Sequence, residues 1–141
     1  MSYLICALGA WFAAQVIKVI ITAVKRKKLD LYAFFASGVM PSSHTALVTA
    51  LTINVGMHLG FCSIYFAICA VFSMVIMYDA AGVRRSVGEQ AKKINQLLDQ
   101  YYNSQDLDNA QLGERIAEIL GHTPREVLAG FLLGVLFGIL I

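Results

Sequence analysis

Two short polar stretches each place a histidine at the start of an apolar segment. The first, Pro41-Ser42-Ser43-His44, leads into the apolar run 46–61. Proline and serine before an apolar run are signals for a helix start, and the free N–H groups of a helix N-terminus form a site for an anion such as phosphate. The second, His122-Thr123-Pro124-Arg125-Glu126, repeats this arrangement at the head of segment 124–141. The sequence therefore predicts two imidazoles beside helix N-termini.

These residue types suit phosphoryl transfer through a histidine. A neutral imidazole attacks phosphorus through one ring nitrogen, while a carboxylate on the other nitrogen fixes the tautomer and stabilises the cation that forms. His122 and Glu126 are four residues apart, so they are neighbours if the helix begins at His122. Histidine titrates near neutral pH, so His44 suits general acid catalysis. Helix N-termini with lysine and arginine would supply the donors that a phosphoryl group needs, without a metal ion or cofactor.

The composition indicates a membrane protein. The chain of 141 residues is 58% hydrophobic and 14% charged, whereas soluble domains carry about 25% charged residues. This length predicts a single domain, 1–141. The net charge of +2 gives no indication of a nucleic-acid partner. Cys6, Cys62 and Cys69 fall in apolar segments without metal-ligand spacing, so we expect them to be small buried residues.

Four apolar segments approach the length that crosses a bilayer, for which a helix needs about 20 residues. They cover residues 2–24, 43–61, 62–82 and 124–141. Residues 83–102 carry apolar positions at helical spacing among charged ones, which predicts an amphipathic helix outside the bilayer. A loop over 103–109 and a short helix over 110–120, ended by Gly121, complete the prediction.

The basic residues indicate the orientation of this bundle. Of the eleven lysines and arginines, all except Lys18 lie in the two long connectors or at their edges. The positive-inside rule then places both connectors, with both histidine stretches, in the cytoplasm and both termini outside. The predicted fold class is an all-α integral membrane bundle with four transmembrane helices and a cytoplasmic amphipathic helix.

These motifs resemble those of a known superfamily. Pro41-Ser42-Ser43-His44 resembles the Pro-Ser-Gly-His motif of the type 2 phosphatidic acid phosphatase superfamily, which includes the vanadium haloperoxidases. His122 with Glu126 resembles its last motif, a histidine followed four residues later by aspartate. With Tyr78-Asp79-Ala80-Ala81-Gly82-Val83-Arg84-Arg85, the chain is similar to the divergent, mostly bacterial branch over residues 18–138. The resemblance implies a metal-independent phosphohydrolase of the bacterial inner membrane without a cofactor.

The resemblance also implies roles for individual residues. His122 corresponds to the nucleophile that forms a phosphohistidine, and Glu126 to the carboxylate that orients it. His44 corresponds to the acid that protonates the leaving oxygen. Ser42, with the amides of Ser43 and His44, corresponds to the phosphate cradle.

The cations of the superfamily are missing at their usual places. There is no Arg-Pro pair for the first motif, and Ile116 stands six residues before His122 where the superfamily has arginine. The candidates to replace them are Lys18, Arg84, Arg85 and Arg115. Lys18 and Arg84 are favoured because they lie near the span ends that carry the histidines. Asp79, an ionisable residue in a predicted span, is another candidate for the site.

Some of these features have plainer interpretations. Thr123 and Glu126 also fit a capping box with Pro124 at N1, and a helix capped there would leave His122 outside it. Asp79 would pair structurally with Lys18 or Arg84. Residues Gly130, Gly134 and Gly138 form a bare stripe that predicts close helix packing and suggests a homodimer.

Three functions remain open from the sequence. The first is a membrane phosphatase that acts on a lipid phosphate or pyrophosphate at the cytoplasmic leaflet, among membrane lipids. The second is a small transporter or channel subunit that uses Lys18, Asp79 and His58 along a pore. The third is a phosphate-binding membrane protein that has lost catalysis with its missing arginine.

Overall fold

A computed structural model describes residues 2–26, 40–104 and 121–141 of the chain. Within these ranges all regular structure is helical, as predicted. The elements are α1 (Ser2–Arg26), α2 (Ser43–Leu59), α3 (Ile64–Tyr78), the π-helical turn η2 (Asp79–Val83), α4 (Arg84–Ser104) and α5 (Pro124–Leu140). The short helix predicted over 110–120, with Arg115, lies outside the described residues.

Two of these helices are long and apolar enough to cross a membrane. They are the stretch Tyr3–Lys25 of α1 and the continuous helix Ile64–Tyr101 formed by α3, η2 and α4. Helices α2 and α5 have 17 residues each, or about 26 Å at the usual rise, somewhat less than the roughly 30 Å of a hydrocarbon core. The structure therefore supports two membrane-capable helices, and the four-span bundle stays a prediction.

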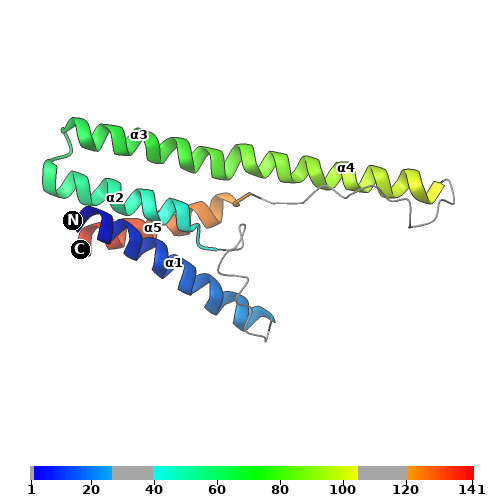
Figure 1. The fold of residues 1–141 in the computed structure, drawn as a ribbon, viewed down its shortest axis with the longest axis horizontal. Coiled ribbons are helices and arrows are strands. Elements are labelled where there is room, and N and C mark those ends of the chain that lie inside the picture. The colour runs from blue at the N-terminus through cyan, green and yellow to red at the C-terminus, as the bar shows by residue number, and fades with distance from the viewer. Residues whose placement is uncertain (1, 27–39, 105–120) are drawn as a thin grey trace.

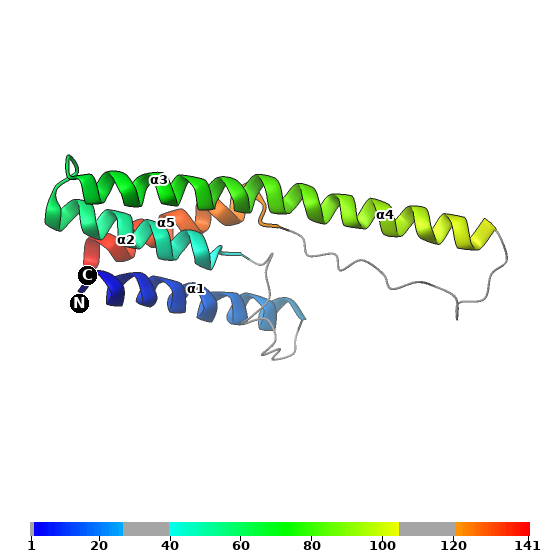
Figure 2. The ribbon, with the colours of Figure 1, turned by 45° about the horizontal axis from the view of Figure 1, so that its top comes forward.

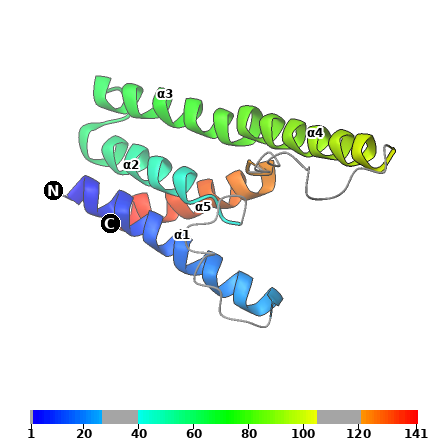
Figure 3. The same cartoon turned by 45° about the vertical axis from the view of Figure 1, so that its right-hand side comes forward.

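Helix α2 lies at the centre of the bundle and packs against α1, α3 and α5 (Figures 1, 2 and 3). The N- and C-termini lie together at one end, and the starts of α2 and α5 lie toward the other (Figure 1). The core between α1 and α2 consists of small residues, with two larger ones from α5 against it: Cys6, Ala10, Ala14, Ala46, Ala50, Leu133 and Phe137. Both histidine stretches therefore share one end of the bundle.

Small and polar residues fill the interior, while large apolar side chains face outward. Thr45 and Asn54 are fully buried, whereas Leu4, Phe12 and Phe72 are each more than half exposed. Soluble domains bury such large apolar residues. Small residues at helix contacts and apolar outer faces are typical of helices packed in lipid.

The glycine row of α5 packs against α2 of the same chain. A methyl group on Gly130 would strike the carbonyl oxygen of Ser42, and one on Gly134 would lie 2.6 Å from Cβ of Thr49. Gly138 is close in the same way to Ile53. This row is therefore occupied within one molecule, so a homodimer stays a prediction that would need another face.

The third apolar segment and the amphipathic segment form one unbroken helix (Figure 1), in place of the predicted boundary at residues 82–83. The bridge between them is η2, where the N–H of Arg84 donates to the carbonyl of Asp79, five residues earlier. Because η2 contains no proline, the helix continues through it without a break. One extra residue is accommodated in this single wider turn.

Candidate active site

The start of α2 is capped by Ser42. This residue has an extended backbone, and its Oγ accepts hydrogen bonds from the backbone N–H of Thr45 at 3.4 Å and from the Thr45 hydroxyl at 2.9 Å. Ser42, Ser43 and Thr45 are buried, whereas His44 is exposed. The Ser42 hydroxyl thus stabilises the helix start, and the His44 imidazole faces outward from the first turn.

Lys18 of α1 reaches the same region from inside the bundle. Its side chain is 2% exposed, and Nζ donates to Oγ of Ser43 at 3.2 Å. A charged group in an apolar bundle is costly without polar partners. Lys18 therefore places a positive charge behind the first turn of α2, one of the two cation positions that the sequence favours.

The start of α5 combines the two interpretations that the sequence set against each other. Thr123 is the N-cap: its Oγ1 accepts from the N–H of Glu126, and Oε2 of Glu126 accepts from the N–H of Thr123 at 2.9 Å. The same Oε2 lies 3.2 Å from Nδ1 of His122. Since a carboxylate oxygen has room for two donors, Glu126 closes the capping box and also holds His122, which lies outside the helix.

Contacts with η2 and α4 hold the backbone around His122. Its N–H donates to the carbonyl of Ala80 at 3.1 Å. At Gly121, an added Cβ would lie 2.7 Å from the carbonyl carbon of Arg84 and 2.8 Å from Cα of Arg85. Only glycine permits this approach, so Gly121 docks the histidine onto the long helix.

The two helix starts are also joined directly. The N–H of Ser42 donates to the carbonyl of Glu126 at 3.0 Å, which ties the N-cap of α2 to the first turn of α5. This bond sets the spacing between the two histidine stretches, although they are separated by some eighty residues along the chain.

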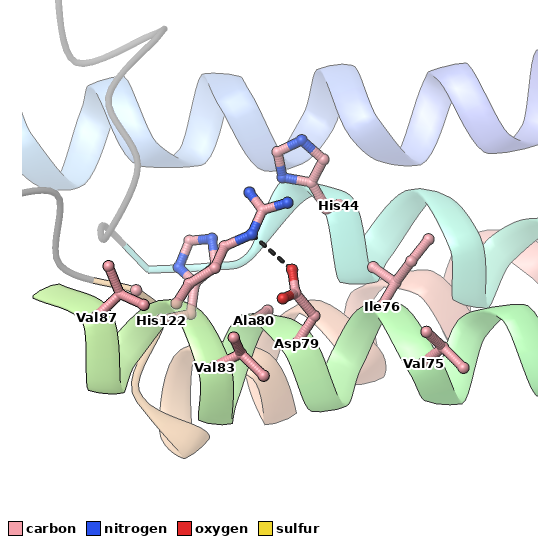
Figure 4. Close-up of a pocket in the computed structure, with 10 residues that line it drawn as sticks. His44, Val75, Ile76, Asp79, Ala80, Val83, Val87 and His122 are labelled. Carbon is pink, nitrogen blue, oxygen red and sulfur yellow. Dashed lines mark hydrogen bonds and ion pairs between the residues drawn. The ribbon is translucent and has the colours of Figure 1, made fainter.

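A pocket of about 460 Å³ opens beside these contacts, and both histidines line it (Figure 4). Its polar side chains are His44, His122, Asp79 and Arg84. Its apolar side chains come from the long helix: Val75, Ile76, Ala80, Val83 and Val87. The pocket thus combines two imidazoles and a guanidinium with an extended apolar wall.

The structure places the candidate cation Arg84 in the pocket and its neighbour Arg85 outside it. Arg84 lines the pocket and pairs through Nε with Oδ2 of Asp79 at 2.6 Å, the contact marked by the dashed line in Figure 4. Asp79 thus takes Arg84, and not Lys18, as its partner in the described part of the chain. Arg85 is not among the lining residues, and its Nε pairs with Oε1 of Glu89 at 3.0 Å. The prediction of Arg85 in the site therefore finds no support in this geometry.

The surroundings of His122 favour the neutral imidazole. Burial lowers the pKa of His122, and the positive charges of Lys18 and Arg84 lower it further, while the hydrogen bond and the charge of Glu126 oppose them. Because a carboxylate only accepts, the proton of the neutral ring lies on Nδ1. The Nε2 lone pair is then available for attack near neutral pH.

Three features of this site had no clear signal in the sequence. The sequence predicts Gly121 as a helix stop, whereas in the structure its close contact is with the backbone of Arg84 and Arg85. The Ala80 carbonyl and the π turn around it are backbone features without a residue signature. The one hint in the sequence is the possible pairing of Asp79 with Arg84, because residues five apart do not normally meet on an α-helix. Among the described residues, no three His, Cys, Asp or Glu side chains gather as metal ligands do.

The fold and the site define a class of protein: a helical membrane protein with two histidines and an arginine around one pocket. The model of the Divergent PAP2 family, where PAP2 abbreviates type 2 phosphatidic acid phosphatase, matches residues 1–137, and the chain belongs to this family. This confirms the resemblance noted from the motifs. The uncharacterized membrane protein YuiD of Bacillus subtilis (strain 168) is 43% identical over 140 residues, which are 94% of this chain and 89% of that protein. No solved structure matches the chain.

Proposed function

We propose that this protein hydrolyses a lipid phosphate or pyrophosphate monoester through a phosphohistidine on His122. The observation that supports this most strongly is that His122 and His44 line one pocket, with Nδ1 of His122 on Glu126. Arg84 supplies a guanidinium to the same pocket. A nucleophile, a general acid and a cation are the parts that metal-free phosphoryl transfer needs.

In the first half of the reaction, Nε2 of His122 forms a bond to phosphorus while the bond from phosphorus to the lipid oxygen breaks. Protonated His44 gives its proton to that oxygen, so a lipid phosphate leaves as its alcohol and a lipid pyrophosphate leaves as the lipid monophosphate. The imidazolium formed on His122 is stabilised by Glu126 through Nδ1–H. Arg84 and the buried charge of Lys18 offset the negative charge on the equatorial oxygens.

In the second half, water attacks the phosphorus and the P–N bond breaks. His44, now neutral, takes the proton from the water, and inorganic phosphate leaves. Both histidines then return to their starting protonation states. His44 therefore acts first as acid and then as base, which suits a side chain that is exposed at the pocket and exchanges protons readily.

The apolar wall supports an amphiphilic substrate. Val75 and Ile76 extend the pocket along α3, away from the histidines, and Figure 4 shows these side chains beside the polar groups. A phosphate head bound between His44 and His122 would leave an acyl or isoprenoid chain along this wall. The distribution of basic residues supports a site at the cytoplasmic leaflet of the inner membrane, with both termini outside.

The test is phosphate release by purified protein in mixed micelles from phosphatidate, phosphatidylglycerol phosphate and an isoprenoid pyrophosphate. We expect wild type to release phosphate from at least one of them and His122→Ala to release none. His58→Ala is the matched control, because His58 lies near the other end of α2, bonded to the carbonyl of Asn54. Full turnover by His122→Ala would contradict the proposal. Vanadate binding without turnover would instead indicate a phosphate-binding protein.

A further inference from the structure

We infer that Asp79 is a positioning residue that holds the guanidinium of Arg84 for the phosphoryl group, an inference that rests on the proposed function. The two residues lie in the part of the long helix that lines the pocket. Their pairing is close, 2.6 Å between Nε and Oδ2. Two observations support a positioning role: the atom of Arg84 that is used and the local helix geometry. A second arginine–carboxylate pair on the same helix lies outside the pocket and provides a control.

The atom used by Asp79 leaves the rest of the guanidinium available. Arginine has five N–H donors, and the fork of its two terminal nitrogens matches the oxygens of phosphate. Asp79 accepts from Nε, which is the donor at the base of the fork. The side chain of Arg84 is 67% exposed, whereas that of Asp79 is 38% exposed. The carboxylate therefore anchors the base of the guanidinium from the more enclosed position.

The π turn explains why residues five apart meet. In an α-helix, residues at i and i+5 diverge by about 140° around the axis, and side-chain pairs form at i+3 and i+4. In η2, one additional residue occupies the turn, and the N–H of Arg84 donates to the carbonyl of Asp79. The same turn presents the Ala80 carbonyl to the N–H of His122. One local irregularity thus aligns the arginine, its carboxylate and the nucleophile.

The neighbouring pair on α4 provides a matched control. Arg85 uses the same atom, Nε, toward Oε1 of Glu89 at 3.0 Å, at the ordinary i,i+4 spacing. Neither residue lines the pocket. Glu89→Gln therefore removes an arginine–carboxylate contact from the same helix without changing the pocket, whereas Asp79→Asn removes the one inside it.

Removing the charge of Asp79 distinguishes a positioning role from simple electrostatic repulsion of the ligand, because the two predict different changes in kcat and KM. A carboxylate in a phosphate pocket repels the ligand, so removing it would lower KM and leave kcat unchanged if repulsion were its main effect. If it instead orients Arg84 toward the equatorial oxygens, its removal lowers kcat, because the lost interaction is strongest in the transition state. We expect kcat of Asp79→Asn to fall on the order of 10-fold, with KM unchanged or lower.

The experiment is a double-mutant cycle with Asp79→Asn, Arg84→Lys and the double variant, assayed on the lipid phosphate that wild type hydrolyses. If Asp79 acts through Arg84, the double variant is no slower than Arg84→Lys alone. Glu89→Gln should match wild type. Wild-type kcat in Asp79→Asn, or additive losses in the double variant, would overturn the inference. Asp79→Ser replaces Asp79→Asn if that variant does not fold.

Vanadate binding separates this inference from the proposed function. Wild type that hydrolyses lipid phosphate, together with Asp79→Asn that behaves like Glu89→Gln, would overturn only the role of Asp79. Wild type that binds vanadate but releases no phosphate would overturn the catalytic proposal, and weaker vanadate binding by Asp79→Asn would still support the positioning of Arg84. Wild type with neither property would overturn both.

Discussion

At the start of α2 the histidine follows the N-cap residue, and at the start of α5 it precedes it. Ser42 and Thr123 are both hydroxyl caps that accept a hydrogen bond from the backbone three residues later. His44 therefore belongs to the first helical turn and is exposed, whereas His122 lies before the helix and is buried. The two helix starts are capped alike, but the first leaves its imidazole exposed and the second holds its imidazole buried.

This difference matches the two chemical tasks of the proposed reaction. His122 is fixed by the Glu126 carboxylate and by its own N–H on the Ala80 carbonyl. A nucleophile needs such a fixed ring and tautomer, because small displacements from the line of attack are costly. An acid that later acts as base needs contact with water, and the exposed position of His44 provides it. Variants of the two histidines and of their partners test this division of roles.

Replacement of the fixed histidine should have the largest effect. For His122→Ala we expect turnover to fall by up to about 10⁶-fold, as for removal of a catalytic nucleophile. Labelling with a radioactive lipid phosphate should trap an acid-labile phosphoenzyme in wild type and none in the variant. Equal labelling of both proteins would mean that His122 does not carry the phosphoryl group.

Loss of the carboxylate that fixes His122 should come next. Glu126→Gln should lower kcat by up to about 10⁴-fold, the scale seen when an imidazole loses its orienting carboxylate. The pH profile adds a second readout. Burial already lowers the pKa of His122 below its usual 6.5, and Glu126 opposes this shift. The acid limb of kcat/KM for wild type should therefore lie below pH 6.5, where His122 becomes protonated. Deprotonation of His44, whose pKa is also lowered, by burial and by the charges of Lys18 and Arg84, sets the alkaline limb.

Without Glu126, the pKa of His122 should fall further, and the acid limb of the profile should move to lower pH. The sign follows because the neutral imidazole is the active form and the carboxylate favours the charged one. A profile of Glu126→Gln that is lower in rate but unshifted, or shifted to higher pH, would show that Glu126 does not act through the charge on His122.

Replacement of the exposed histidine should have a smaller and substrate-dependent effect. For His44→Ala we expect a loss of about 10²- to 10⁴-fold on lipid phosphates, the usual contribution of a general acid. Aryl phosphates, whose leaving groups depart without a proton, should be affected much less. Equal losses on both substrate types would assign His44 to phosphate binding and remove the contrast with His122.

The parts of this arrangement that could be predicted from sequence are local ones. Apolar run lengths indicate the helices, and Thr123-Pro124-Arg125-Glu126 indicates the cap of α5, because both depend on neighbours in the chain. The sequence sets the cap against the histidine partner as interpretations of Glu126 while allowing it part of both roles, and in the structure one carboxylate oxygen serves both donors.

Contacts between distant elements could not be predicted in the same way. Nothing in the row of α5 glycines specifies α2 as its partner, because a bare stripe fits any close backbone. The π turn at Asp79 has no sequence signature either, since its residues also suit an ordinary helix. Its role becomes visible only once Gly121 and His122 are docked against it.

The smallest expected effects come from the caps themselves, and they distinguish helix stability from catalysis. Thr123→Ala removes Oγ1, one of two acceptors of the Glu126 N–H, and leaves the carbonyl of residue 123 at 3.0 Å. It should lower the free energy of unfolding by about 1 kcal/mol. Its kcat should stay close to wild type, because Oε2 of Glu126 still receives Nδ1 of His122 and the backbone N–H of residue 123.

Ser42→Ala should be more destabilising, since Ser42 is fully buried and its Oγ accepts two hydrogen bonds. Thermal unfolding in detergent, measured beside kcat for both variants, checks the pair. If Thr123→Ala lost as much activity as Glu126→Gln with only a small drop in Tm, the capping box would be what orients His122. The contact between Glu126 and His122 would then contribute less to catalysis than the capping box does. The two helix starts would differ only in whether the histidine precedes or follows the N-cap residue.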